Sequence, residues 1–114
     1  MKSIITILLG LFICLPLMAA DKDKEEFEFW KRSAEKGNAF GQYTLGVLYA
    51  KGLGVPEDNV TAYAWVNIAA ANGDAKAKKN RDSIAKEWTP DQIAKAETLS
   101  KEMLKKNPKL IKKP

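Results

Sequence analysis

The residues that could do chemistry in this chain are its carboxylates, because it contains no histidine and a single cysteine, Cys14. Without an imidazole there is no Ser-His or Cys-His nucleophile and no usual set of zinc ligands. Nearly all of the 14 Asp and Glu residues lie beside lysines or at predicted helix caps. The carboxylates at 21 and 23, and at 57 and 58, are too sparse for a calcium loop, which spaces about five or six oxygen ligands over about twelve residues. The sequence therefore predicts no catalytic residue, no cofactor site and no metal site.

Side chains that could bind a partner are more plentiful, because aromatic residues are frequent after residue 20. They include Phe27, Phe29, Trp30, Phe40, Tyr43, Tyr63, Trp65 and Trp88. Helical spacing puts Phe27 and Trp30 on one face, whereas Phe29 points elsewhere. An exposed subset would form a patch for a protein partner, and the alternative is that every ring packs inside a small core. The candidate partner-binding residues are Phe29, Phe40, Tyr43, Tyr63 and Arg81.

Arg81 lies in the run Asn80-Arg81-Asp82 in the middle of a predicted helix. A guanidinium group can hold a carboxylate through two parallel hydrogen bonds. That carboxylate could belong to a partner or to the fold itself, and we favour a bridge within the fold.

Helical periodicity sets the positions of these residues. A charged lead-in at residues 21–26, expected to be frayed, precedes five predicted helices at about residues 27–36, 39–50, 59–72, 75–87 and 90–106. The helix boundaries carry cap signals, namely Gly37 with Asn38, Pro56 with Asp58, Gly73 with Asp74, and the capping box Thr89-Pro90-Asp91-Gln92. No stretch alternates polar and apolar residues for long enough to form a strand. The sequence therefore predicts an all-α fold.

The C-terminal residues are basic. They carry Lys101, Lys105, Lys106, Lys109, Lys112 and Lys113 against Glu102 alone. Pro108 ends the predicted helical order, so we expect residues 107–114 to form a disordered basic tail. Such a tail could contact anionic lipid, at about 1 kcal/mol for each lysine near the surface. The alternative is a tail that is simply solvated.

The first twenty residues have the order of a secretory signal peptide. Lys2 precedes the apolar stretch 4–17, Pro16 breaks that stretch, and the small pair Ala19-Ala20 leads into a charged run. We expect cleavage after Ala19 or Ala20. An uncleaved membrane anchor would need about 20 apolar residues, and a lipoprotein would need a small residue where Ile13 precedes the cysteine. The sequence therefore predicts an exported chain whose mature part, 21–114, has no cysteine and depends on packing alone.

A repeat of 36 residues runs through the predicted helices. Residues 34–39, Ala-Glu-Lys-Gly-Asn-Ala, return at residues 70–75 as Ala-Ala-Asn-Gly-Asp-Ala. A helix end, a glycine, a cap and an alanine coincide, and the offset is close to the period of helix-turn-helix solenoids. The physical interpretation is a stack of helical hairpins.

At these residues the chain resembles the Sel1-like repeat, a relative of the tetratricopeptide repeat. The resemblance covers one full repeat at about residues 34–73, with half-units on either side. Residues 63–90 also resemble the C-terminal end of short exported members of the family. The repeat-defining residues are Gly37, Leu45, Gly46, Tyr49, Gly52, Gly54, Asp58, Ala62, Trp65, Ala69, Ala70 and Gly73. Their roles are structural, because small residues such as Gly46 let helix backbones approach closely and the larger side chains fill the space between hairpins.

The resemblance implies a short right-handed α-solenoid of antiparallel helical hairpins, which serves protein–protein contact and has no catalytic residues to carry over. Stable arrays usually have three or more repeats, so we expect the outer helices to act as caps, or the protein to stack on a partner or on a second copy. With the signal peptide, the leading hypothesis is a periplasmic or secreted adaptor that binds an envelope protein. The alternative is a protein that uses its lysine-rich C-terminus on anionic membrane. Nucleic acid is disfavoured as a partner of an exported chain.

Overall fold

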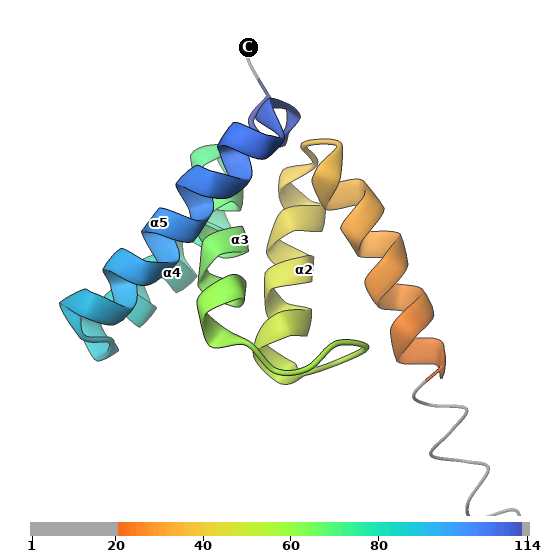
Figure 1. Cartoon of the computed structure of the whole chain (residues 1–114), viewed down its shortest axis with the longest axis horizontal. Coiled ribbons are helices and arrows are strands. Elements are labelled where there is room, and N and C mark those ends of the chain that lie inside the picture. Colours follow the sequence, from red (N-terminus) through yellow and green to blue (C-terminus); the bar gives the residue numbers. More distant parts are fainter. Residues whose placement is uncertain (1–20, 113–114) are drawn as a thin grey trace, which may run out of the picture.

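Helices account for all the regular structure in the part of the chain that is described. The computed structural model describes residues 21–112, and the expected signal peptide lies outside that range. The elements are a helix at residues 21–35, α2 (Ala39–Lys51), α3 (Asn59–Ala71), α4 (Ala75–Glu87), α5 (Pro90–Lys106) and the 3-10 turn η1 (Pro108–Leu110). Successive helices run antiparallel and fan out on either side of α2 and α3 (Figure 1). The predicted all-α solenoid of about five helices is confirmed.

The helix at residues 21–35, which we call the first helix, begins earlier than expected. Residues 21–26 are helical, although the sequence predicts a frayed lead-in there. The loop after α2 packs against this end of the helix, because a Cβ added to Gly54 would lie 2.8 Å from the carbonyl carbon of Asp23 and from the Cβ of Phe27. Glycine at this position therefore allows a contact that holds the charged residues in helical order.

The 36-residue repeat is a repeat of backbone geometry. Gly37 and Gly73 both have a φ of 92°, which favours glycine. Each donates its N–H to the carbonyl three residues before it, at 3.0 Å. Asn38 and Asp74, which follow them, each accept a backbone N–H from the next helix at 2.8 Å. The two predicted hairpin turns are confirmed.

The other predicted helix starts are also confirmed. Asp58 accepts the N–H of Thr61 at 3.1 Å and caps α3. Thr89 and Gln92 form the reciprocal pair of a capping box, with Pro90 as the first residue of α5. These signals are local, so they do not depend on how the helices pack.

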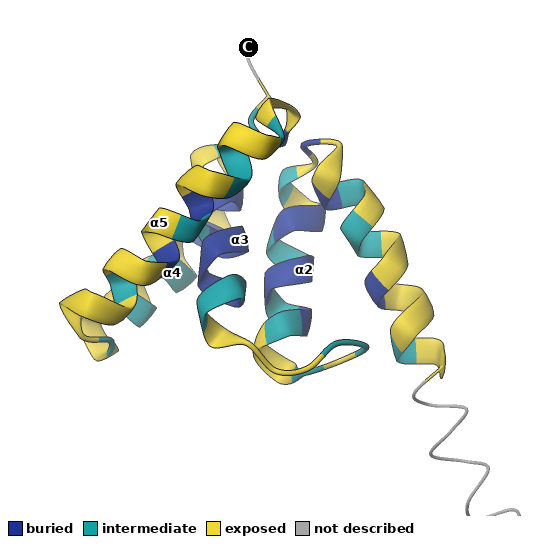
Figure 2. Ribbon diagram, viewed as in Figure 1, coloured by how far each residue is buried: buried dark blue, intermediate teal, exposed yellow. Residues whose placement is uncertain are grey.

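The centre of the core lies between α2 and α3, where most of the buried residues are found (Figure 2). Leu45 of α2 and Ile68 of α3 are fully buried. Gly46 lies where the two helices approach closely, because an added Cβ would be 2.9 Å from Val66 Cγ2 and 3.0 Å from the Ala62 carbonyl oxygen. The prediction that Gly46 admits a neighbouring helix is confirmed, and that helix is α3.

The C-terminal segment is ordered, so the predicted disordered tail is wrong for residues 107–111. The turn η1 inserts Leu110 into the main core, where the residue is 2% exposed. The segment lies beside the loop that joins the first helix to α2 (Figure 1), and Asn107 Nδ2 donates to the Glu35 carbonyl at 3.0 Å. The apolar pair Leu110-Ile111 within the lysine-rich stretch supplies buried surface that opposes disorder.

A buried glutamine holds this segment in place. Gln42 has no exposed surface, and its Nε2 donates to the carbonyls of Ala34 at 3.1 Å and Leu110 at 2.7 Å. Its Oε1 accepts from Asn72 Nδ2 at 2.7 Å, and the same Nδ2 donates to the Leu110 carbonyl at 2.6 Å. Asn72 Oδ1 accepts the N–H of Lys112 at 2.9 Å. Because both side-chain amides are paired, they join distant parts of the chain without leaving a buried polar atom unsatisfied.

Candidate partner-binding surface

A groove of about 370 Å³ lies between α2 and α4, and residues of α3 also line it. Its apolar lining consists of Tyr43, Val47, Ala50, Ala62, Tyr63, Val66, Ile84 and Trp88. A polar depression shares Tyr43 and Asn80 with this groove and extends it along α4 past Lys76 and Lys79. The two together, which we call the α2–α4 groove, form a surface with apolar and basic parts.

Helical spacing explains why α2 and α4 present these side chains to one groove. On α2, Tyr43 and Val47 are four residues apart, and on α4 Asn80, Ile84 and Trp88 recur every four residues, so each set shares a face. α4 ends at Glu87, and the N–H of the C-cap residue Trp88 donates to the Ile84 carbonyl at 3.0 Å. The two facing rows are therefore set by helix geometry.

Tyr63 is positioned differently from the expectation. It is a candidate partner-binding residue, but its side chain is only 3% exposed and stacks on Trp88 with ring centroids 5.3 Å apart and an interplanar angle of 29°. Burial is the main reason that the pKa of its hydroxyl is raised above the ordinary value, and the Glu97 carboxylate adds to this effect. Tyr63 therefore stays neutral at physiological pH and supports the indole ring that lines the groove.

The charge of the groove has one sign. Its lining includes Lys51, Lys76 and Lys79 and no carboxylate. Asn59 and Asn80 add side-chain amides, which can both donate to and accept from a peptide backbone. Chemically, this arrangement suits a segment that carries apolar side chains and negative charge.

A second apolar surface, which we call the N-terminal aromatic patch, consists of Phe29, Trp30 and Phe40. Phe29 is 56% exposed and Phe40 is 54% exposed. Trp30 meets both rings edge-on, with centroids 5.0 Å from Phe29 and 5.5 Å from Phe40. The exposure of Phe29 and Phe40 agrees with the sequence analysis, and their contact with a partner stays a prediction.

The two remaining candidate partner-binding residues, Tyr43 and Arg81, lie in different surroundings. Tyr43 is half-buried, packs against the small core cluster of α3 and α4, and lines the α2–α4 groove. The bridge within the fold that we favour for Arg81 is a local one, because its Nε lies 3.6 Å from the carboxylate of the adjacent Asp82. That pair is open to solvent and stabilises little. A contact between Arg81 and a partner carboxylate stays a prediction.

Sequence reasoning missed the α4 wall of the groove. Lys76, Asn80, Ile84 and Trp88 recur every four residues, a spacing that places them on one face of a helix. The pattern could have shown that these residues act together. It could not have shown that they face α2, because that depends on Ala77 packing into the core.

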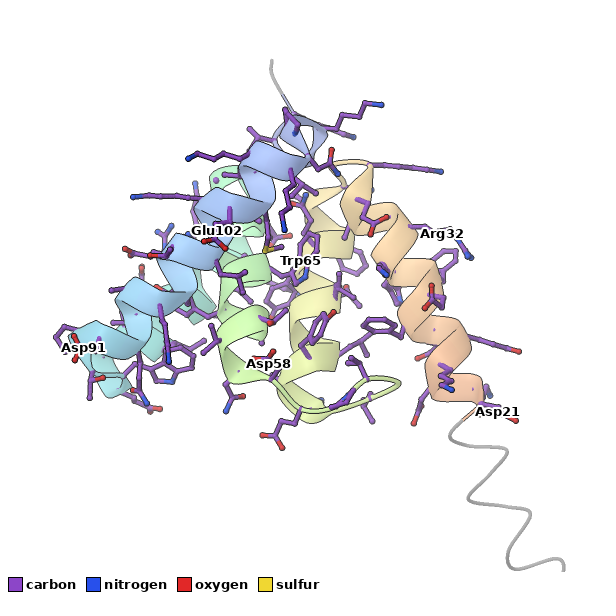
Figure 3. All side chains as sticks on the ribbon, in the orientation of Figure 1. Asp21, Arg32, Asp58, Trp65, Asp91 and Glu102 are labelled. Atoms are coloured by element: carbon purple, nitrogen blue, oxygen red, sulfur yellow. The ribbon has the colours of Figure 1, made fainter. Side chains whose placement is uncertain are left out.

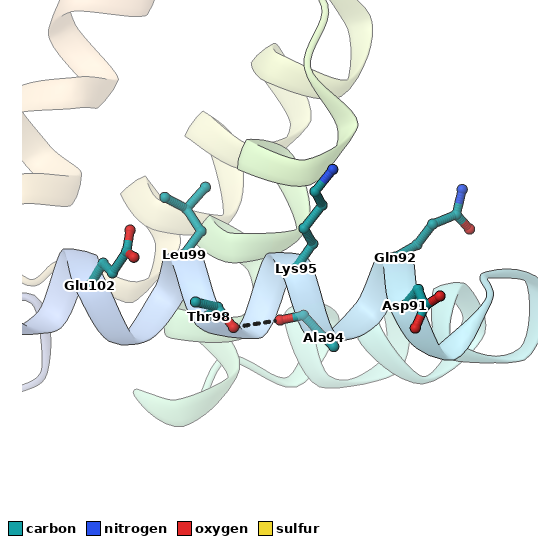
Figure 4. Close-up of a pocket in the computed structure, with 7 residues that line it drawn as sticks. All are labelled: Asp91, Gln92, Ala94, Lys95, Thr98, Leu99 and Glu102. Atoms are coloured by element: carbon teal, nitrogen blue, oxygen red, sulfur yellow. Dashed lines mark hydrogen bonds between the residues drawn. The ribbon is translucent and has the colours of Figure 1, made fainter.

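The outer face of α5 lacks the features of a binding site. Figure 4 shows the shallow surface lined by Asp91, Gln92, Ala94, Lys95, Thr98, Leu99 and Glu102. All of these belong to one helix, so no second element closes over a ligand. Residues 21–112 also contain no group of three or more Asp, Glu, His or Cys side chains that could hold a metal ion. No helix within this range is long and apolar enough to cross a bilayer.

No protein-family model matches this chain. Two curated fungal proteins are similar to part of it. Chitin synthase regulator SKT5 of Malassezia restricta is 30% identical over 71 residues, or 62% of this chain. Chitin synthase regulatory factor 3 of Schizosaccharomyces pombe is 38% identical over 65 residues, or 56% of this chain. The chain spans 5% and 7% of the lengths of these two relatives.

A solved structure supports the family more directly. It is the crystal structure of c5321, described as a protective antigen present in uropathogenic Escherichia coli strains displaying an SLR (Sel1-like repeat) fold. It matches 77% of this chain with a TM-score of 0.67 and 31% sequence identity, and the match spans 20% of that protein's chain. The helical hairpins, the paired glycine turns and this similarity agree. The chain therefore has the Sel1-like repeat fold, and this fold implies a helical-repeat module for protein–protein interaction.

Proposed function

We propose that this chain is an exported adaptor of the cell envelope that binds a protein partner in the α2–α4 groove. Export is supported by the order of positive, apolar, helix-breaking and small residues in positions 1–20. Partner binding is supported by the fold and, above all, by the groove, which joins an apolar lining to three lysines without a carboxylate. That combination is the observation that carries the proposal.

The chemistry of the groove describes the segment that fits it. An acidic peptide with a large apolar side chain would place that side chain against Val47 of α2 and Ile84 of α4, which both line the groove. Its carboxylates would lie near Lys51 and Lys79, and its backbone would bond the Asn80 amide. The two fungal relatives are named as regulators of another protein, a role that binding could serve.

Site-directed photo-crosslinking in cells tests the groove. A photoreactive amino acid in place of Val47 should crosslink a defined envelope protein, and the same group in place of Thr98 on the outer face of α5 should not. Adding Lys51→Glu or Lys79→Glu should reduce the crosslink at least about tenfold, since each reverses a charge at the site. The matched control Lys95→Glu should leave it unchanged. Equal crosslinking from both positions, or insensitivity to the two groove substitutions, would contradict the proposal.

Export is tested separately by fractionation and N-terminal sequencing. The protein recovered from the envelope should begin at Ala20 or Asp21, because the signal peptide would have been removed. Recovery from the cytoplasm with Met1 in place would contradict export without bearing on the groove.

The membrane alternative is tested by substituting lysines of the C-terminal segment and not by truncating it. Lys105, Lys106, Lys109 and Lys112 are exposed, so they are free to approach anionic lipid. Truncation after residue 107 would also remove Leu110 from the core, and lost binding would then be ambiguous. The double substitution Lys109→Gln with Lys112→Gln removes charge and keeps the core. Salt-sensitive binding to anionic vesicles that weakens in this variant would support the alternative, and unchanged binding would refute it.

A further inference from the structure

The two ends of this solenoid differ in their outer surfaces. Terminal repeats need a polar outer face for solubility, and α5 has one, with Asp91, Lys95 and Glu102 along it (Figure 4). The opposite end, formed by the first helix and the start of α2, exposes Phe29 and Phe40 by more than half of their surface. The N-terminal end is therefore the one that lacks a polar cap.

Charge along the first helix is divided between its two halves. Residues 21–28 contain five carboxylates and two lysines, whereas residues 29–36 contain three basic side chains and one carboxylate. Phe29 lies near the middle of the helix. Two copies that run antiparallel would bring each acidic half beside the basic half of the other copy. We propose that the chain forms a homodimer through this surface, with the two-fold axis beside Phe29.

The helix period sets the register of this contact. Glu26 and Arg32 each lie three residues from Phe29, both are exposed, and within residues 21–112 neither forms an ion pair. Arg32 projects from the outer side of the first helix, away from α2 (Figure 3). In the dimer, Arg32 of each copy faces Glu26 of the other, so symmetry makes the pair twice. Lys22 faces Lys36 only at the rim, where water and salt screen the repulsion.

The rings at the centre are already arranged for such a contact. Trp30 is partly buried against the main core and holds Phe29 and Phe40 edge-on. Because the rings support one another, less side-chain freedom is lost when a second copy covers them. The contact is isologous, so pairing closes at two copies and does not continue into a filament.

A second copy fits this surface better than an unrelated partner does. The α2–α4 groove has one sign of charge and calls for a molecule of the opposite sign. The exposed face around Phe29 has both signs, placed symmetrically about an aromatic centre, so it is complementary to itself. The dimer therefore goes beyond the proposed adaptor function and uses a different surface.

The oligomeric state tests the proposal. The processed protein, purified from cells that express the full chain, should show a monomer–dimer equilibrium by sedimentation equilibrium at concentrations on the order of 100 μM. Phe29→Ala should raise the dimer dissociation constant at least about tenfold, because it truncates an aromatic side chain at the centre of the contact. The matched control Leu53→Ala, another exposed apolar side chain, should not change it.

Charge exchange tests the register. Glu26→Lys and Arg32→Glu should each abolish the dimer, since each places like charges opposite one another. The double variant should dimerise again, and an equimolar mixture of the two single variants should form a heterodimer. Glu102→Lys on α5 serves as the matched charge-reversal control. A wild-type protein that stays monomeric to about 1 mM, an unaffected Phe29→Ala variant, or a double variant that fails to recover would overturn the proposal.

Discussion

Replacing Leu110 with alanine should destabilise this protein, although the residue lies in a lysine-rich stretch whose composition predicts disorder. Leu110 is 2% exposed and packs in the main core. Truncation of a buried leucine to alanine costs about 2–5 kcal/mol, depending on how well the site collapses around the cavity. We expect a loss of about 2–3 kcal/mol, near the lower end of this range, because the segment can also be released.

Release of the segment limits the cost. The Leu110 carbonyl accepts from Gln42 at 2.7 Å and from Asn72 at 2.6 Å, and the N–H of Lys112 donates to Asn72 at 2.9 Å. Hydrogen bonds of this kind contribute about 0.5–1.5 kcal/mol each. When the lost packing exceeds what these bonds supply, residues 107–112 detach while the helices stay folded. The free energy of unfolding then falls no further.

Urea denaturation followed by circular dichroism measures this loss. Thermal denaturation measures the corresponding change in Tm. For a domain of about 100 residues, 1 kcal/mol corresponds to about 4–8 °C in Tm, so we expect a fall in Tm of about 8–24 °C. The matched control is Leu53→Ala, which makes the same change at a residue that is 37% exposed and should alter stability by less than about 0.5 kcal/mol. If Leu110→Ala behaves like this control, residues 107–112 do not dock in solution and the reasoning is refuted.

Three further predictions concern helix packing and caps. Gly46→Ala should lower stability by about 1–2 kcal/mol in denaturant unfolding, because the added methyl would lie 2.9 Å from Val66 and overpacking outweighs the gain in helix propensity; an unchanged midpoint would show that α2 and α3 can separate freely. Thr89→Ala should cost about 1 kcal/mol through loss of the α5 cap, with faster amide exchange in its first turn. Hydrogen bonds from Thr61 lower the pKa of Asp58. Because the folded-state pKa is depressed, this stabilisation is complete above the unfolded-state value of about 3.9 and is lost as pH falls through the folded-state value. Asp58→Asn should reduce the loss of unfolding free energy as the pH falls, and a dependence of stability on pH identical to that of the wild type would contradict this role of Asp58.

The helix boundaries were predictable because their causes are local. Asn38, Asp58, Asp74 and Thr89 cap helices through bonds to backbone groups three residues away. This capping geometry depends only on a few consecutive residues, so the sequence alone predicts it. The 36-residue spacing of the glycine turns then indicated stacked hairpins, and the structure has them.

The candidate site was only partly predictable, because exposure depends on residues far apart in the chain. Phe29 and Tyr63 are both aromatic residues on helices, yet one is 56% exposed and the other 3% exposed. The difference arises because Trp88, which comes 25 residues after Tyr63 in the sequence, stacks on Tyr63. No periodicity within one helix could have shown this contact.

The amino-acid sequence alone determined the helices, their caps and the repeat, since propensity, capping and glycine geometry act over a few residues. The tertiary structure decided which faces are covered. It formed the α2–α4 groove from rows on separate helices, and it ordered the C-terminal segment through Gln42, whose bond to the Leu110 carbonyl joins residues 68 positions apart. The lysines around Leu110 predicted disorder because the local composition is polar. The buried leucine and the paired amides outweigh that composition, because burial and hydrogen bonding are properties of the assembled core.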